Sequence, residues 1–214
     1  MHVAELWRYP VKCMAGESLK SAELGQLGIL GDRIVHVEDG QGRVLTARTH
    51  PRLLALRPTL GPDGEPLVDG RPWSDPEIGT RVETSAEAGA RLVKYEGPER
   101  FDVLPLLVAT DGAIAALGVD GRRLRPNVVI GGVDGLAERE WPGGDGCGWG
   151  QPSSRLLKLR GRCVMTTYDP DTQEQNLSVL RRIVREFGGH MALDCAVAKP
   201  GPVAGGDPVE MLEP

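Results

Sequence analysis

Cys163 lies in a short stretch, residues 160–172, whose residue types could do chemistry. Arg160 and Arg162 flank the approach to the thiol, and the turn-forming run Asp169-Pro170-Asp171 follows it. Guanidinium charge close to a thiol favours the thiolate, which is the form that attacks electrophiles and binds soft metals. A buried structural cysteine is the alternative, and it is the commoner fate of a free thiol. The stretch therefore offers a nucleophile or a metal ligand without deciding between these roles and a structural one.

The residues around Cys163 predict how it is held. The alternating run Leu156-Leu157-Lys158-Leu159 predicts a strand before it. Residues 164–167, Val-Met-Thr-Thr, suit a pleated and half-buried surface, so the strand is expected to continue. Asp169-Pro170-Asp171 predicts a turn, because proline fixes φ and aspartate accepts local backbone hydrogen bonds. We therefore expect Cys163 on a strand, between arginines on one side and a polar turn on the other.

The first half of the chain, to about residue 85, is expected to be all-β. Short apolar runs, beginning with residues 3–9, alternate with turn residues at short intervals. Asp39-Gly40-Gln41-Gly42 is a hairpin signal. The Gly-, Pro- and Asp-rich residues 61–80 are interpreted as hairpins and loops, and residues 86–100 as a connector.

The second half contains two predicted helices. Thr110 can cap a short helix at residues 111–117, which Gly118 would end. Residues 175–187 have helical periodicity, with arginines opposite an apolar face. That face comprises Leu177, Leu180, Ile183, Val184 and Phe187.

Residues 142–154 are rich in Gly, Trp and Ser and have no periodicity. Such a composition predicts a mobile loop, in which Cys147 would be exposed.

Composition excludes several classes of protein. The 214 residues, 40% of them hydrophobic and 26% charged, are typical of a soluble globular protein. A net charge of −5 argues against nucleic-acid binding. The sequence has no apolar run of membrane-spanning length and no signal-peptide pattern at its start, so neither a nucleic acid nor a membrane is an expected partner. The four cysteines form no CxxC pair, which argues against a zinc or iron–sulfur ligand set and fits a reducing cytoplasm.

With these motifs laid out, the chain resembles the MOSC family, which is named for the C-terminal domain of molybdenum cofactor sulfurase. Residues 1–85 resemble the N-terminal β-barrel module that often precedes a MOSC domain, and residues 86–214 resemble the MOSC domain itself. The motifs of the first part are Tyr9-Pro10-Val11-Lys12, Gly31-Asp32-Arg33 and Thr46-Ala47-Arg48. Those of the second part are Arg125-Pro126-Asn127, Arg162-Cys163-Val164-Met165-Thr166-Thr167, Asp169-Pro170-Asp171-Thr172 and Gly206-Asp207-Pro208-Val209.

The resemblance implies a fold and a cofactor. The expected fold is mixed α/β and mostly β, a MOSC-type β-barrel with an N-terminal β-barrel module and few helices. The cofactor would be the molybdenum cofactor (molybdopterin), bound in the cleft between the two parts, with the Cys163 thiolate as the metal ligand. The resemblance places Lys12, Arg33, Arg125 and Asn127 near its pterin and phosphate, with Arg162 and Arg48 as further candidates. It also carries a family-level association with pyridoxal phosphate binding.

Each of these residues also has a purely structural interpretation. Lys12 and Arg33 could be solvated surface charges, Arg125 could pair with a carboxylate, and Asn127 could satisfy a turn after Pro126. Two positions depart from the reductases of the family, in which serine is common: Cys13 follows Lys12, and Gly161 lies two residues before Cys163. Residues 143–154 also depart, because the family usually has a strand pair there.

Three functions remain open at the level of sequence. The first is an oxidoreductase that reduces N-hydroxylated or N-oxide small molecules at a Cys163-ligated molybdenum centre, with a separate protein as electron donor. The second is a sulfur carrier that uses a Cys163 persulfide in metal–sulfur cofactor assembly. The third is a non-catalytic barrel that binds an anion or a partner, in which Cys163 is merely buried.

Overall fold

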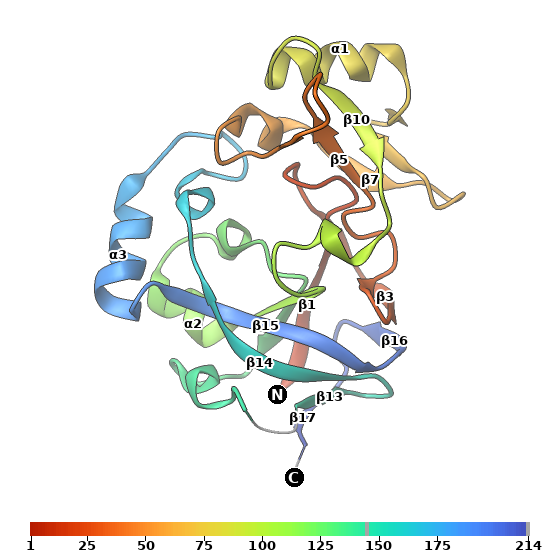
Figure 1. Cartoon of the computed structure of the whole chain (residues 1–214). Coiled ribbons are helices and arrows are strands. Elements are labelled where there is room, and N and C mark those ends of the chain that lie inside the picture. Colours follow the sequence, from red (N-terminus) through yellow and green to blue (C-terminus); the bar gives the residue numbers. More distant parts are fainter. Residues whose placement is uncertain (144–145, 213–214) are drawn as a thin grey trace.

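The structure, a computed structural model, describes residues 1–143 and 146–212 and is dominated by strands (Figure 1). Within these ranges the α-helices are α1 (Pro76–Ser85), α2 (Asp111–Leu117) and α3 (Leu177–Phe187). The 3₁₀ helices are η1 (Pro51–Ala55), η2 (Pro98–Arg100), η3 (Gly121–Leu124), η4 (Ala137–Glu140) and η5 (Val164–Thr167). The predicted class, mostly β with few helices, is confirmed.

One large sheet carries eight strands in the order β17-β13-β14-β15-β11-β12-β1-β2. In chain order these are β1 (His2–Arg8), β2 (Glu17–Leu19), β11 (Leu106–Thr110), β12 (Val128–Gly131), β13 (Cys147–Trp149), β14 (Ser153–Gly161), β15 (His190–Lys199) and β17 (Val209–Met211). Because β1 pairs antiparallel with β12, the first strand of the chain is built into the sheet of the second half. The only parallel pair among the described ladders of this sheet, β11 with β12, is joined by the crossover through α2.

Three small sheets of three strands complete the fold, in the orders β10-β5-β6, β16-β3-β4 and β7-β8-β9. Their strands are β3 (Ser21–Gly25), β4 (Gly28–Ile29), β5 (Val35–Glu38), β6 (Val44–Leu45), β7 (Pro58–Leu60), β8 (Pro66–Val68), β9 (Arg71–Pro72), β10 (Arg91–Lys94) and β16 (Gly201–Ala204). The late strand β16 pairs with the early strand β3, so the two halves of the chain interlock. As far as the described residues show, each hydrogen-bonded sheet keeps two edges and none closes on itself. The domain boundary between residues 85 and 86 stays a prediction.

The expectation that the first half is all-β was wrong, because α1 lies in it. Asp75 caps this helix, its side chain accepting a hydrogen bond from the Glu77 N–H at 2.8 Å, and Pro76 occupies the first turn. Ile78 and Val82, four residues apart, are fully buried in the N-terminal core. The glycine and proline content of this segment led to the prediction of a loop. The pair Asp75-Pro76, which is typical of a helix start, was the sequence signal for the helix.

The prediction for α2 is confirmed residue by residue. The Thr110 hydroxyl accepts a hydrogen bond from the Ala113 N–H at 3.1 Å. Gly118 ends the helix in the left-handed conformation, with φ 71°, and its N–H donates to the Ile114 carbonyl. The crossover between the two parallel strands is therefore fixed at both ends by local sequence.

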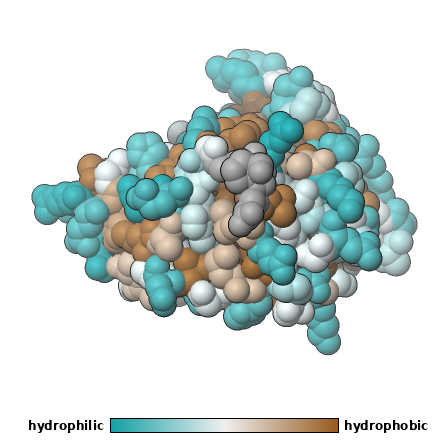
Figure 2. Space-filling view, turned by 90° about the horizontal axis from the view of Figure 1, so that it is seen from below, coloured by the Kyte–Doolittle hydropathy of each residue, from teal (hydrophilic) through white to brown (hydrophobic). Residues whose placement is uncertain are grey.

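The helix predicted at residues 175–187 is present as α3, but its apolar face was only partly right. Ile183 and Phe187 are buried together with Val179, and they pack against α2 and β15. Leu177 and Val184 are instead 46% and 58% exposed. Seen from below, hydrophobic side chains gather among hydrophilic ones on the left of the surface, the side on which α2 and α3 lie in Figure 1 (Figure 2).

The loop predicted at residues 142–154 was wrong for residues 147–149 and 153–154, which are strand; Gly144 and Asp145 lie outside the described residues. β13 pairs with both β14 and β17, so the strand pair expected from the resemblance is retained. Cys147, predicted to be exposed, is fully buried. The close approach of two backbone segments explains why residue 146 is glycine. A Cβ atom at Gly146 would lie 2.1 Å from the Ser154 carbonyl oxygen, so no side chain fits there.

None of the helices in residues 1–143 and 146–212 has the length and apolar character that crossing a membrane requires.

Candidate functional site

Cys163 lies just after β14 and just before η5. The strand before the thiol was correctly predicted, but it ends at Gly161, so the expectation that Cys163 lies on a strand was wrong. Residues 164–167 form a 3₁₀ helix instead of continuing the strand. The Thr166 hydroxyl donates to the Cys163 carbonyl at 2.9 Å, and the Thr167 hydroxyl donates to the Val164 carbonyl at 2.7 Å. These threonines bond back to the backbone instead of lining a strand, which bends the chain immediately after the thiol.

The predicted turn after η5 is confirmed. One oxygen of the Asp169 carboxylate accepts hydrogen bonds from the N–H groups of Asp171 and Thr172, both at 3.0 Å. Cys163 is therefore carried on a tight connection with both flanking segments tied down locally.

The thiol of Cys163 faces a pocket of about 150 Å³. The N-terminal part of the chain and the second half both supply its walls. Every residue predicted for the site lines it, namely Lys12, Arg33, Arg125, Asn127, Arg162 and Cys163, together with Arg48. The tertiary structure thus gathers the predicted set in one place, while the binding role of each residue stays a prediction.

Backbone strain is concentrated around this pocket. Cys13, Arg33 and Arg125 have φ values of 67°, 55° and 55°, in the left-handed region that favours glycine. They are half of the six non-glycine residues with positive φ in the described parts of the chain. Each such residue costs on the order of 1–2 kcal/mol. Strain of this kind clusters at active sites and ligand clamps, which supports a functional role for the pocket.

Arg125 presents an unpaired donor. Its guanidinium lies 4.2 Å from the centre of the Tyr9 ring, and that of Arg33 lies 4.9 Å from the same ring. The Nη2 atom of Arg125 is buried and has no hydrogen-bond partner among the described residues. Burial, followed by the neighbouring charge of Arg33, lowers the pKa of Arg125. A buried cationic N–H without a partner is costly, so an anionic or carbonyl group bound here would be stabilised.

Arg162 is the second such donor. Its Nη2 atom donates to the Leu124 carbonyl at 2.7 Å, whereas its buried Nε atom has no partner within the described parts of the chain. Burial, and then the charge of Arg160, lowers the pKa of Arg162 to about 10. Arg160 forms an ion pair, its Nε atom lying 2.6 Å from the buried carboxylate of Asp194, although the geometry of this contact is not that of a hydrogen bond. Arg162 therefore stays protonated near neutrality and has hydrogen-bonding capacity left.

Asp102 is a pocket residue that the sequence analysis missed. Its two carboxylate oxygens lie 2.8 Å from the Lys12 Nζ atom and 2.8 Å from the Arg48 Nη2 atom. Burial alone would raise the pKa of Asp102, but the hydrogen bond from Lys12 and the charges of Lys12, Arg48 and Arg160 hold it below its usual range. Nothing in the local sequence distinguishes Asp102, since its role depends on two residues more than fifty positions away.

Asn127 is fully buried and ties the pocket floor together. Its Oδ1 atom accepts from the Leu107 N–H at 3.1 Å and from the Arg33 Nη1 atom at 3.4 Å. Its Nδ2 atom donates to the Trp7 carbonyl at 3.3 Å. The amide thus links β1, β11 and the start of β12 and also orients Arg33, while contact with a cofactor stays a prediction.

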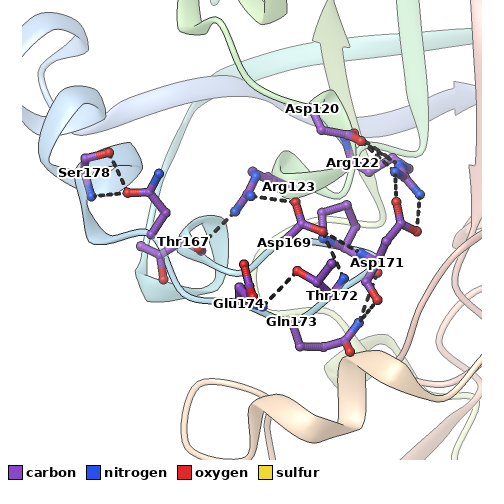
Figure 3. Close-up of polar contacts among 12 residues, drawn as sticks. Asp120, Arg122, Arg123, Thr167, Asp169, Asp171, Thr172, Gln173, Glu174 and Ser178 are labelled. Atoms are coloured by element: carbon purple, nitrogen blue, oxygen red, sulfur yellow. Dashed lines mark hydrogen bonds and ion pairs between the residues drawn. The ribbon is translucent and has the colours of Figure 1, made fainter.

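An ion-pair network beside the pocket joins the segment before Arg125 to the turn after Cys163 (Figure 3). Arg122, on η3, lies 2.7 Å from Asp120 and 2.6 Å from Asp171. Arg123 donates to Asp169 at 2.9 Å and also to the Thr167 carbonyl at 2.9 Å. Exposed pairs contribute only about 0.2–1 kcal/mol each, but this network fixes the segment before Arg125 against the turn after Cys163.

Tyr9 supports both strained arginines and gives a pH-dependent prediction. The ring is fully buried, and its hydroxyl donates to the Pro126 carbonyl at 3.1 Å. Burial raises the pKa of Tyr9 to about 12, so the folded chain keeps a proton that the unfolded chain loses near pH 10. Stability present below pH 10 is therefore expected to fall by about 3 kcal/mol as the pH rises towards 12.

Urea unfolding of the wild type and of Tyr9→Phe between pH 9 and pH 12 would measure this component. Tyr9→Phe should lose stability less steeply than the wild type over that window. Equal slopes for the two proteins would contradict the assignment.

Comparison with known proteins gives the family. The MOSC N-terminal beta barrel domain matches residues 1–100, and the MOSC domain matches residues 109–210. The chain therefore belongs to the MOSC domain proteins and carries the N-terminal barrel domain as well.

Particular relatives can also be named. Mitochondrial amidoxime-reducing component 1 of Homo sapiens is 26% identical over 98% of this chain and 82% of that protein. Mitochondrial amidoxime reducing component 2 of Macaca fascicularis is 27% identical over 79% of this chain and 67% of that protein. The crystal structure of the YUAD protein from Bacillus subtilis shares the fold, with a TM-score of 0.53 at 14% identity over 97% of this chain and 92% of that one.

Proposed function

We propose that this MOSC protein binds a molybdenum cofactor and reduces N-hydroxylated or N-oxide small molecules. The observation that carries the proposal is the pocket at Cys163, where a thiol lies with buried arginine donors of Arg125 and Arg162 that have no hydrogen-bond partner among the described residues. The relatives named as amidoxime-reducing components support the reaction class.

The residues present fit such a cofactor in their chemistry. An anionic sulfur suits a high-valent metal, and Cys163 places a thiol in the pocket beside its cations. Arg125 and Arg162 have free N–H donors for a phosphate or for pterin carbonyls, and Arg33 and Lys12 add positive charge. When bound, the cofactor would supply the two-electron chemistry that removes an oxygen atom from the substrate.

The chain's own residues would bind the cofactor, hold the pocket's cations in position and shield the reacting groups from water. Asp102 holds Lys12 and Arg48 in fixed positions, and Asn127 does the same for Arg33. Phe101, Leu104 and Leu107 supply apolar wall, which limits the access of water to the reacting groups. Electrons would come from a separate electron-donor protein, and the substrate would be a small molecule.

Metal and pterin content test this proposal. The chain would be expressed in a host that makes the cofactor, then analysed for molybdenum by elemental analysis and for pterin by fluorescence. Near-stoichiometric amounts of both are expected. Their absence, in a preparation where another MOSC reductase loads in the same host, would exclude this function.

A second candidate is sulfur transfer, in which Cys163 carries a persulfide. The observation that favours it is the contrast among the cysteines. Cys163 is partly exposed in a cationic pocket, whereas Cys147 and Cys195 are fully buried, which raises the pKa of both thiols. A sulfur adduct on Cys163 by mass spectrometry, without pterin, would distinguish this function from the first.

A further inference from the structure

The pocket contains a second thiol, that of Cys13. Cys13 and Cys163 both line it and both are partly exposed. The two cysteines come from different halves of the chain: Cys13 follows β1 and Cys163 follows β14. The other two cysteines of the chain are fully buried elsewhere in the large-sheet core. Two of the four cysteines are thus available for chemistry, and they share one pocket.

Packing brings the two segments together. Cys13 and Met165, which lies two residues after Cys163, pack against the same hydrophobic cluster, built around Val11 and Met14. Both thiols line the pocket together with Arg48, whose guanidinium is held 2.8 Å from the Asp102 carboxylate. One cation therefore stands beside both sulfurs, where it would stabilise a thiolate on either.

The backbone at Cys13 is held in an unfavourable conformation. Its φ of 67° lies in the left-handed region, and the turn is fixed by the Lys12 N–H donating to the Val35 carbonyl at 2.8 Å and the Met14 N–H donating to the Val11 carbonyl at 3.3 Å. Glycine would adopt this conformation at no steric cost. A cysteine side chain here is strained, and the strained position presents its thiol to the pocket.

We propose that Cys13 and Cys163 form a two-thiol site that accepts sulfane sulfur from a small-molecule persulfide and releases it as hydrosulfide. The proposal rests on the second of the two functions proposed above and assigns a residue and a product to it. Cys163 is the acceptor, and Cys13 is the resolving thiol.

The chemistry balances in two displacements. First, the Cys163 thiolate attacks the outer sulfur of the persulfide RS–SH, which forms Cys163–S–SH and expels RS⁻. Second, the Cys13 thiolate attacks the Cys163 sulfur of that adduct, which forms the Cys13–Cys163 disulfide. The electron pair of the broken S–S bond leaves with HS⁻.

The two thiolates are oxidised, the sulfane sulfur is reduced, and no further oxidant is consumed. A small-molecule thiol would reduce the disulfide by exchange and restore both cysteines.

The test uses the full chain, free of cofactor, with glutathione persulfide as the donor. Free thiols are alkylated after the reaction under denaturing conditions, and non-reduced peptides are mapped by mass spectrometry while hydrosulfide is measured. We expect a peptide pair linked through Cys13 and Cys163 and roughly one hydrosulfide per chain in a single turnover. Cys147 and Cys195 serve as internal controls and should be recovered alkylated.

Variants separate the two thiols. Cys13→Ser should keep the persulfide on Cys163 and lower hydrosulfide release at least about tenfold, because the resolving attack is lost. Cys13→Gly suits the left-handed backbone and should behave in the same way, which guards against misfolding of the serine variant. Cys163→Ser should take up no sulfur in the pocket.

Two results would overturn the inference. They differ in whether the carrier function, on which the inference rests, fails as well. A stable Cys163 persulfide in the wild type, without the disulfide, would remove the role of Cys13 and leave the carrier function standing. A wild type that takes up no sulfur on Cys163 would remove both.

Discussion

The proposed cofactor site predicts that replacing Cys163 by alanine abolishes molybdenum binding and leaves the fold intact. Cys163 lies on a connection that is held by backbone hydrogen bonds and by the hydroxyl groups of Thr166 and Thr167. Removing a partly exposed sulfur therefore costs little stability. Loss of partners one shell away from a metal already lowers affinity by about 10–100-fold, so loss of the ligand should lower metal content at least tenfold.

The measurement is molybdenum and pterin per chain, together with the thermal midpoint, for Cys163→Ala and for a matched control. Leu157→Ala changes an exposed side chain on β14, a few residues before the thiol, and should load like the wild type. A Cys163→Ala protein that keeps full metal content would refute Cys163 as the ligand. Pterin retained without metal would indicate that the arginines hold the organic part by themselves.

Replacing Trp149 by alanine is expected to destabilise the protein by about 3–5 kcal/mol, the largest stability effect we predict. Trp149 is fully buried on β13 within the core of the large sheet. Its indole N–H donates to the Ser154 hydroxyl at 3.0 Å, so the change leaves both a cavity and an unpaired hydroxyl.

Urea unfolding of Trp149→Ala would measure this loss, with Gln151→Ala as the matched control from the same segment. Gln151 is exposed, so its replacement should stay within about 0.5 kcal/mol of the wild type. A similarly small effect at Trp149 would mean that residues 147–154 behave as the mobile loop that their composition suggested, and would contradict the strand pair.

The predictable parts of this fold are those specified by neighbouring residues. The ends of α2 at Thr110 and Gly118 and the turn at Asp169 all depend on hydrogen bonds within a few positions. The Asp39 turn is of the same kind, its carboxylate accepting from the Gln41 N–H at 2.8 Å. Local sequence carries such signals in full, because both partners lie in one short window.

The mistaken predictions share a different cause. Glycines at 146, 148 and 150 were interpreted as mobility, whereas the absence of a side chain at Gly146 permits contact with the backbone at Ser154. In α3 the helical periodicity was predicted correctly. The neighbouring helix and sheet, however, bury Val179 and leave Leu177 and Val184 exposed. When a helix has apolar residues on two stripes, the neighbouring elements determine which stripe is buried. The sequence of the helix alone does not contain that information.

The sequence by itself determined the mostly β class, the family resemblance and the residue types of the site, because motifs and turn chemistry are local. The tertiary structure decided which of those residues meet. It gathered Lys12, Arg33, Arg125 and Cys163 around one pocket, added Asp102, and brought Cys13 to the same pocket as Cys163. It also buried donors of Arg125 and Arg162 without partners. Burial and unpaired charge depend on every surrounding segment at once, which is why no stretch of sequence could reveal them.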